Sequence, residues 1–422
     1  MTGKFASAIC IVAVLVMAQV CSAATNAELE QRITELEKRL GEVESEKVSL
    51  GFGDVEVGGR VMNDWMWISE DDNVRSAIGD QEDGIEFRRI WLFVEGDVAE
   101  NVGYKVQLNF AGGGTDLQDV YLKLDGLPLG TWKIGHVKEP FSLVEFTSSK
   151  YITFMERSLP DIFAPAWNTG IMVSNTALED SMTWAASLTR ETDSNGELID
   201  DGGYNATGRI TFNPGYENDG AEVVHLGAAY SRKNPPDSNG ATAGDDFRFR
   251  ARPEAHQTDR FVNTGFFGAD SIDLIGLEAA WVAGPFSLQG EYVMANVEGN
   301  SGQPDPEFDG WYAQASYWLT GEHRNYKRSS GNFGRVRPHN NFGENGGMGA
   351  WEVAARISNV DLNDSGITGG ELDDCTLGLN WHLNPHTRIM WNYVRADAED
   401  VGGTAGTDGD ADIFMMRFQI DF

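Results

Sequence analysis

The sequence predicts an all-β fold: a transmembrane antiparallel β-barrel of about 16 strands, preceded by a short N-terminal coiled-coil helix. Three observations predict it. Apolar and polar residues alternate with period two after Leu50, aromatic residues lie near the ends of the apolar faces, and no apolar run beyond the N-terminus is long enough for a membrane helix. Lipid-facing and lumen-facing residues alternate along barrel strands, so a mean hydropathy of −0.34 does not exclude a membrane protein.

Residues 1–24 have the composition of a secretory signal peptide. Lys4 precedes an apolar run at 8–18 that is too short to span a membrane, and small residues at 22–24 supply a cleavage site. Cys21 raises a lipoprotein alternative, but a bulky residue precedes it where a lipobox needs a small one. The mature chain would then keep only Cys375, which excludes a disulfide framework and a Cys/His zinc site.

Residues 25–48 are expected to form a periplasmic coiled-coil helix. Apolar residues recur there at spacings of four and three, with charged residues at many of the positions between. The apolar positions are Leu29, Ile33, Leu36, Leu40 and Val43. A coiled coil of this length would help subunits to trimerise; the alternative is an amphipathic helix on the floor of the barrel.

Residues 49–422 are expected to form an outer-membrane barrel, because an even number of strands closes a barrel and about sixteen leave an aqueous channel. The last strand ends on Phe422, which resembles the signal read by the barrel-assembly machinery. The predicted interfacial aromatic residues are Trp311, Tyr317, Trp381, Trp391 and Tyr393. The predicted strands are 54–67, 84–97, 103–111, 117–125, 131–137, 170–176, 182–190, 205–213, 222–231, 272–283, 286–296, 309–319, 348–358, 371–383, 386–396 and 412–422.

The longest segment without a strand pattern is 138–168, which contains three prolines and many apolar residues. An exposed loop of this length is normally polar, and a long irregular loop is usually functional. We therefore expect it to fold inward and to narrow the pore. The alternative is a surface loop that makes subunit contacts.

Several segments resemble the phosphate-selective porin O and P family. They are FRRIWLFVEGD at 87–97, YKVQLNFAGG at 104–113, KIGHVKEPFSLVEFTSSKYITFMERSLPDIFAPAWNTG at 133–170, YWLTGEHRNYKRSSGNFGRVRP at 317–338 and GAWEVAARISNVDLND at 349–364. The resemblance covers essentially everything after residue 50. It implies a trimer of 16-stranded barrels whose third extracellular loop folds into the lumen.

The resemblance also implies a phosphate site, formed by a lysine and a serine on the inward loop below a ladder of lumen arginines. Ser149 and Lys150 fall in the matching TSSK segment, and we place Lys138 and Arg157 at the same constriction. Selective members carry further lysines here, whereas this sequence has Glu145 and Phe146 and so departs from the full lysine cluster.

Alternation and the resemblance together predict a set of lumen cations. They are Arg88, Arg89, Lys105, Arg356 and Arg417. Arg88 and Arg89 are adjacent and would face opposite sides of the strand unless a bulge intervenes. For each cation the alternative to ion binding is a salt bridge to a lumen carboxylate such as Glu352 or Glu291.

A basic cluster at 322–339 is predicted to form an extracellular loop. Its cations are Arg324, Lys327, Arg328, Arg335 and Arg337, against the single acid Glu322. Such a cluster would funnel anions to the mouth, or contact anionic lipid or a neighbouring subunit. The formal charge of −33 acts the other way, since acidic runs in loops around the mouth would favour cations.

These observations predict an outer-membrane porin that passes small inorganic or organic ions passively, with anions including phosphate as the leading class. No catalytic motif, metal site, cofactor motif or nucleic-acid partner is expected. The expected partners are outer-membrane lipid, two further copies of the chain and the barrel-assembly machinery. The alternatives are a general or cation-preferring porin, and a structural barrel that anchors the envelope.

Overall fold

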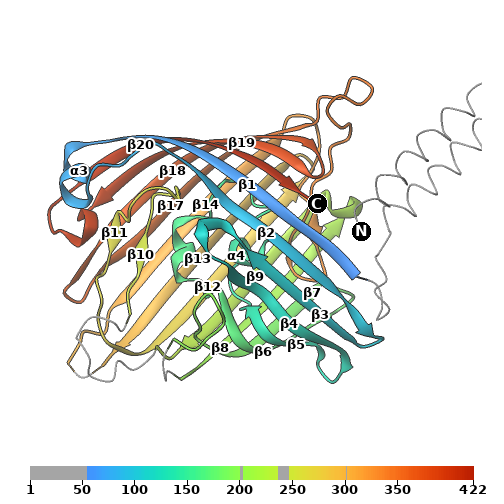
Figure 1. Cartoon of the computed structure of the whole chain (residues 1–422), viewed down its shortest axis with the longest axis horizontal. Coiled ribbons are helices and arrows are strands. Elements are labelled where there is room, and N and C mark those ends of the chain that lie inside the picture. The colour runs from blue at the N-terminus through green and yellow to red at the C-terminus, as the bar shows by residue number, and fades with distance from the viewer. Residues whose placement is uncertain (1–54, 200–202, 236–246, 301) are drawn as a thin grey trace, which may run out of the picture. The chain divides into compact units, whose positions relative to one another are not determined.

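Sixteen antiparallel strands form a closed barrel in the computed structural model, which describes residues 55–199, 203–235, 247–300 and 302–422 (Figure 1). Each strand pairs with the next one along the chain, and the last pairs with the first. The predicted fold class is confirmed. The predicted signal peptide and coiled-coil helix lie outside the described residues.

The barrel strands follow the predicted order, with ends that differ by a few residues. They are β1 (Val55–Glu70), β2 (Gly84–Ala99), β3 (Val102–Asn109), β4 (Asp116–Leu127), β5 (Gly130–Lys138), β6 (Trp167–Ala177), β7 (Met182–Arg190), β8 (Tyr204–Glu217), β9 (Glu222–Lys233), β12 (Ala269–Ala283), β13 (Phe286–Gly299), β14 (Glu307–Trp318), β17 (Ala350–Asp364), β18 (Ile367–Asn384), β19 (Thr387–Glu399) and β20 (Gly409–Asp421).

The connections between barrel strands carry the remaining elements. The helices are α3 (Asp72–Ile78) and α4 (Leu143–Phe146), with 3-10 turns η1 (Ala111–Gly113), η2 (Leu159–Phe163), η3 (Asn218–Gly220) and η4 (Val401–Gly403). Two small hairpins are formed by β10 (Arg250–Ala251) with β11 (Val262–Asn263), and by β15 (Tyr326–Lys327) with β16 (Asn332–Phe333). No helix in the described part of the chain is long and apolar enough to cross a bilayer.

The barrel closes between its first and last strands. β1 pairs with β20 from Arg60, opposite Asp421, to Glu70, opposite Ala411. Phe422 lies one residue beyond the end of β20, and its N–H donates to the carbonyl of Gly59 at 3.1 Å while its own carbonyl accepts from the Gly59 N–H at 2.8 Å. Closure leaves no strand edge unpaired, as a lipid environment requires.

Burial in this barrel is the reverse of burial in a soluble protein. Along β20, Arg417 and Gln419 face the interior and are at most 4% exposed, whereas Phe418 and Ile420 face outward and are 39% and 48% exposed. Alternate residues of a strand point to opposite faces, so this pattern repeats around the wall. The apolar outer face fits lipid, and the polar inner face fits a channel that loops have partly filled.

The two ends of the barrel differ in the length of their connections. At the end where the chain enters β1 and leaves β20, most connections are tight turns, such as 100–101, 128–129, 284–285 and 385–386. The opposite end carries longer loops, such as 71–83, 139–166 and 400–408. Bacterial barrels keep short turns in the periplasm, which places the chain termini of the barrel on that side.

The predicted extracellular position of the basic cluster at 322–339 is wrong. The connection 319–349, which contains this cluster, follows β14, the twelfth strand of the barrel, and a connection after an even-numbered strand returns to the end where β1 begins. Contacts with short turns of that end agree: Arg328 donates to the carbonyl of Glu179 and to Ser181 Oγ, the latter at 3.2 Å. The number of barrel strands that precede a connection decides at which end of the barrel it lies.

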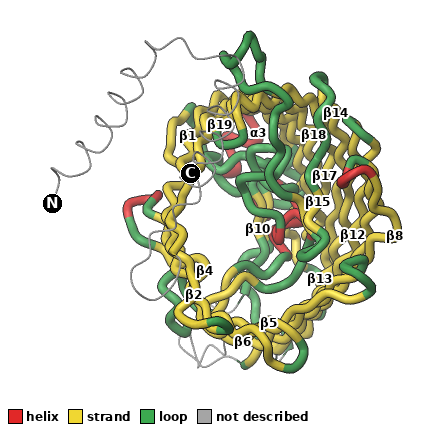
Figure 2. Tube along the Cα trace, turned by 90° about the vertical axis from the view of Figure 1, so that its right-hand side faces the viewer, coloured by secondary structure: helices red, strands yellow, loops and turns green. Residues whose placement is uncertain are grey.

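An apolar core lies inside the barrel, against the wall formed by β12 to β20. Loop residues such as Phe141, Met155, Phe249 and Phe261 pack there against inward-facing wall residues such as Leu274. Figure 2 shows loop segments crowding one side of the barrel, while the strands near β1, β2 and β4 border the opposite side. The loops therefore decide where solutes can pass.

We expect Leu277→Arg to reduce the free energy of unfolding by about 2–4 kcal/mol more than Leu277→Ala does. Leu277 is 54% exposed in the middle of β12, where the outer face meets the bilayer, and a charge near the midplane is costly. Urea-induced unfolding from lipid vesicles measures the difference. Equal losses for the two variants would contradict a lipid-facing outer surface.

Candidate functional site

The inward loop, residues 139–166 between β5 and β6, folds into the lumen and carries α4 and η2 (Figure 1). Four of its apolar side chains, Phe141, Met155, Leu159 and Phe163, are at most 2% exposed and belong to the interior core. This packing explains the apolar composition of the segment, because the side chains bury area that an exposed loop would leave in water.

Side chains of the wall bind the backbone of the inward loop. Arg388 donates to the carbonyl of Ile152 at 2.8 Å, and Asn380 donates to the carbonyl of Thr153 at 2.8 Å. The other such donors are Arg417 to Met155, Arg356 to Glu156 at 3.1 Å, Gln419 to Lys150 at 3.2 Å and Arg388 to Ser149 at 3.4 Å. A buried peptide group without a partner costs free energy, so these donors hold the loop in place.

Glu291 on β13 holds the start of α4. Its two carboxylate oxygens accept from the backbone N–H groups of Leu143 and Val144, each at 2.8 Å, and Tyr312 donates to the same carboxylate at 2.6 Å. Glu291 was one of the two carboxylates considered as partners for lumen cations. It instead satisfies the amides at a helix start.

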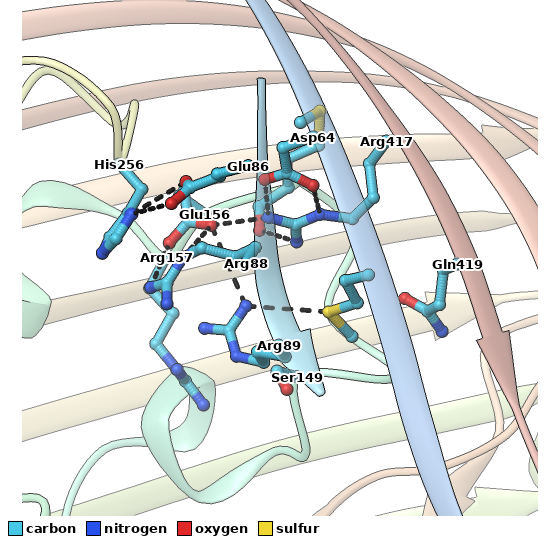
Figure 3. Close-up of polar contacts among 12 residues, drawn as sticks. Asp64, Glu86, Arg88, Arg89, Ser149, Glu156, Arg157, His256, Arg417 and Gln419 are labelled. Carbon is cyan, nitrogen blue, oxygen red and sulfur yellow. Dashed lines mark hydrogen bonds and ion pairs between the residues drawn. The ribbon is translucent and has the colours of Figure 1, made fainter. Parts of the chain in front are cut away.

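A β-bulge turns both Arg88 and Arg89 toward the lumen (Figure 3). The pairing of β1 with β2 shifts by one residue between Met62 and Asn63, which leaves Arg88 as the extra residue. Both guanidinium groups reach Glu156 of the inward loop: Arg88 by two hydrogen bonds of 3.0 Å, and Arg89 at 3.9 Å. The two arginines therefore attach the loop to the wall.

Arg417 is fully buried in the same cluster. Its guanidinium binds both carboxylate oxygens of Asp64, at 2.6 and 2.5 Å, and one of Glu156 at 2.7 Å (Figure 3). Four of its five N–H groups are used, by these two carboxylates and by the carbonyl of Met155, and the side chain is fully buried, so it offers no accessible donor to a passing anion. Arg417 thus points inward as predicted, but it fixes the loop and does not contact solutes.

The segment 247–268, between β9 and β12, also folds inward and covers Arg356. Arg356 donates through Nε to Glu254 of this segment at 3.0 Å, and Ser358 donates to the other Glu254 oxygen at 2.6 Å. His256 of the segment meets Glu86 of β2 at 2.8 Å. Arg356 is 2% exposed, so this predicted lumen cation is also structural.

The β15–β16 hairpin enters the lumen from the periplasmic end and meets the inward loop. Asn332 donates to the carbonyl of Phe146 at 3.1 Å. The hairpin is also attached to the barrel wall, because the hydroxyl of its Tyr326 lies 2.7 Å from a ring nitrogen of His225 on β9. Lys327 lies 5.6 Å from the ring of Tyr151 on the inward loop. The constriction is therefore built from both ends of the barrel.

The basic residues of segment 319–349 separate into several roles. Arg324 is 5% exposed and lies over the Phe333 ring at 3.5 Å, whereas Arg335 binds Asp421 and the carbonyl of Pro385. Arg337 is exposed. Lys327 alone among the five predicted cations lines the chamber described next.

The lower chamber is a cavity of about 370 Å³ between the inward loop, the hairpin and the wall of β1 to β6. Its cations are Arg60, Lys105, Lys138, Lys150, Arg157 and Lys327. Three of them have close carboxylate partners: Lys105 binds Glu95 at 2.9 Å, and Lys138 and Arg157 share Glu145. Within the described residues, Arg60 and Lys327 form no ion pair, and Lys150 has only a 3.8 Å approach to Asp421.

The upper chamber is a cavity of about 300 Å³ on the extracellular side of the inward loop. Arg88, Arg252 and Arg260 line it together with Arg157, which also lines the lower chamber. Arg252 and Arg260 bind backbone carbonyls and make no ion pair with a carboxylate of the described chain. Cations without a carboxylate partner therefore occur on both sides of the constriction.

Comparison with known proteins supplies the family. The family model described as "Phosphate-selective porin O and P" matches residues 55–422, which is the whole barrel. This chain belongs to the phosphate-selective porin O and P family. It is an outer-membrane porin, as expected from the sequence, and the predicted resemblance and localisation are confirmed.

Individual proteins are also similar to this chain in sequence or in fold. Porin O of Pseudomonas aeruginosa is 28% identical over 406 residues, which cover 87% of this porin and 88% of that protein. An anion-selective porin from Comamonas acidovorans has the same fold, with a TM-score of 0.56, 13% identity, and coverage of 87% of this chain and 100% of that chain. OmpT of Vibrio cholerae, in its trimer form, matches with a TM-score of 0.53 and 12% identity over 88% and 99% of the two chains.

Unpaired cations in the lumen of the porin repel one another. Burial and then the charge of Arg60 lower the pKa of Lys150 to about 8, and burial and then Arg335 lower the pKa of Lys327. In the upper chamber, burial and then Arg252 lower the pKa of Arg260 to about 10. Burial is the largest cause in each case, and repulsion by a neighbouring cation is the second, so each of these cations lies close to another positive charge.

Ser149 binds Arg60 of the barrel wall and so orients its guanidinium group. Its hydroxyl accepts a hydrogen bond of 2.5 Å from Arg60 and is 3% exposed, while Arg60 also lies 4.1 Å from the Trp91 ring. The serine lines the lower chamber beside Lys150, as the resemblance implies. We find no group of three His, Cys, Asp or Glu residues suited to a metal ion within the described ranges.

The sequence analysis missed three chamber cations: Arg60, Arg252 and Arg260. Arg252 ends the alternating series FRFRAR at 247–252, whose period-two arginines are a detectable signal. Arg60 lies in a predicted strand and could have been assigned to the inner face with Asp64 by alternation. Nothing in the local sequence indicates that segment 247–268 folds inward.

We expect Arg388→Met to loosen the inward loop, because the variant removes the donors to the carbonyls of Ile152 and Ser149. Single-channel recordings should show a larger mean conductance with more frequent fluctuations. Arg395→Met on the same strand is the control, since Arg395 pairs with Asp410 and Asp412 and contacts no part of the loop. Identical traces for both variants would contradict the anchoring role of Arg388.

We expect anion selectivity to fall as pH rises through about 8, because a lysine with that pKa carries a charge at about pH 6 and is neutral at about pH 10. The measurement is the reversal potential in a chloride gradient as a function of pH. Lys150→Arg should reduce the step near pH 8, since arginine stays charged throughout while the other lysines of the chamber still titrate. A step of unchanged size in Lys150→Arg would assign the titration to another group.

Proposed function

We propose that this porin conducts small anions, inorganic phosphate among them, through the two chambers that meet at Arg157. The observation that carries the proposal is the set of lumen cations without a close carboxylate partner. Arg60 and Lys327 lie below the constriction, with Lys150 no closer than 3.8 Å to Asp421, and Arg252 and Arg260 lie above it. Transport is passive, since fixed charges attract an anion and its gradient drives it. The barrel and the family both support a channel rather than an enzyme.

Selectivity follows from the position of charge and not from its total. The chain carries a formal charge of −33, yet many of its acids lie in loops or in ion pairs with arginine and lysine. A narrow, partly dehydrated passage responds to charges within a few ångströms, because salt screens more distant ones over about 8–10 Å. The unpaired cations of the chambers therefore outweigh the acidic exterior.

Phosphate suits the lower chamber better than chloride does. Arg60 of the wall, Lys150 of the inward loop and Lys327 of the hairpin all line this cavity. A tetrahedral oxyanion can accept hydrogen bonds from several such donors at once, whereas chloride offers a single centre. Similar proteins support this choice: the family is described as phosphate-selective, and the Comamonas porin as anion-selective.

The assembly we propose is a homotrimer in the outer membrane, in contact with its lipid and inserted by the barrel-assembly machinery. The trimer form of OmpT, which shares the barrel fold, supports the first part. Phe422 supports the last part, since it is exposed at the end of the chain and sits at the barrel seam.

Planar-bilayer recordings of the purified porin in a potassium chloride gradient test the proposal. We expect a reversal potential directed toward anions and a chloride current that added phosphate reduces. Lys150→Glu should weaken both effects by about an order of magnitude or more, because it reverses a charge in the lower chamber.

A reversal potential directed toward cations, with no effect of phosphate, would overturn the anion assignment and leave a general porin. Properly folded trimers without any conductance would instead favour a structural barrel. Both results separate from loss of folding if heat-modifiable mobility on gels is recorded for each variant.

A further inference from the structure

Glu145 bridges two cations at the constriction. One carboxylate oxygen lies 2.6 Å from Nζ of Lys138, and the other lies 2.7 Å from Nε of Arg157. The Glu145 side chain is 5% exposed and sits behind the two cations, which are 14% and 13% exposed and line the lower chamber. A single hidden carboxylate thus faces both cations where the two chambers meet.

We propose that Glu145 sets the strength of anion binding in this porin by cancelling one of the two positive charges at the constriction. This inference rests on the proposed anion conduction and deepens it. The group formed by Lys138, Arg157 and Glu145 carries a net charge of one, where two cations alone would carry two. A weaker site releases its anion faster, and conduction requires binding that is loose enough for the ion to leave.

The charge of Glu145 is maintained by its position. Burial alone would raise the pKa of this carboxyl, but the charges of Arg157 and then of Lys138 hold it below its usual value. Asp161 lies 3.8 Å from Arg157, and burial together with the charge of Glu145 raises its pKa well above the usual range. Glu145 therefore carries the negative charge of this group.

Lys138 and Arg157 have contacts other than the Glu145 carboxylate that hold them in position. Arg157 also donates to the carbonyls of Val144 and Thr147, at 3.1 and 3.3 Å. Lys138 donates to the backbone carbonyl of Glu145 at 2.8 Å and lies 4.0 Å from the Trp167 ring. Glutamine is nearly isosteric with glutamate, so Glu145→Gln should remove the charge and leave both cations in the chamber wall.

Three variants of the full-length porin, recorded at about pH 5 so that the lysines keep their charge, test the inference by comparing net charges. Glu145→Gln should raise the anion-to-cation permeability ratio, and lower the phosphate concentration that halves the chloride current, by about tenfold. Lys138→Met should shift both quantities in the opposite direction. The double variant restores the original net charge of the group, so both quantities should return to within about twofold of the unmodified porin.

The rescue distinguishes charge from damage to the loop, because a collapsed loop would not be repaired by a second substitution. Glu217→Gln, at an exposed position at the end of β8, controls for removing an acid from the chain. If Glu145→Gln leaves selectivity unchanged while Lys150→Glu abolishes it, the role of Glu145 is refuted and anion conduction stands. If the unmodified porin prefers cations, the proposed function itself fails.

Discussion

A buried loop must find partners for its peptide groups, and the rest of this structure depends on that requirement. The inward loop has little regular structure of its own, so its carbonyls accept hydrogen bonds from side chains of the wall, among them Arg388, Asn380 and Arg417. Inward-facing polar residues that would otherwise line a wide aqueous pore are used to hold this loop. Loops consequently fill one side of the lumen, and the passage left for solutes along the other side is narrow.

Two kinds of lumen cation follow from this arrangement. Arg356 and Arg417 are enclosed with carboxylates and are structural, whereas Arg60 and Lys327 lack an ion pair within the described residues and face a cavity. A buried cation needs partners, and Arg60, which is 5% exposed, finds them in the Ser149 hydroxyl and the Trp91 ring and not in a carboxylate, so its charge is left uncancelled beside the cavity. The same residue type thus serves packing in one place and conduction in another.

The fold was accessible to sequence reasoning because strand alternation is local. Each of the sixteen strands could be found from its own residues. The bulge at Arg88 could not, since two adjacent arginines are equally compatible with a regular strand whose side chains face opposite sides. The site was only partly accessible. Lys150 and Ser149 stood out in one segment, but the partners that separate Arg417 from Arg60 come from strands and loops far away along the chain. The basic cluster at 322–339 was expected at the extracellular end because a basic loop there would funnel anions to the mouth, but twelve strands precede it and place it at the other end.

The apolar core inside the barrel has an evolutionary consequence. In an empty barrel the width of the passage is fixed by the number of strands, and changing it means adding or deleting hairpins. Here side chains such as Phe141 and Phe261 occupy much of the interior, so substitutions in two loops can reshape the passage while every strand keeps its register. Permeability can then diversify by point mutation among porins whose walls are nearly the same.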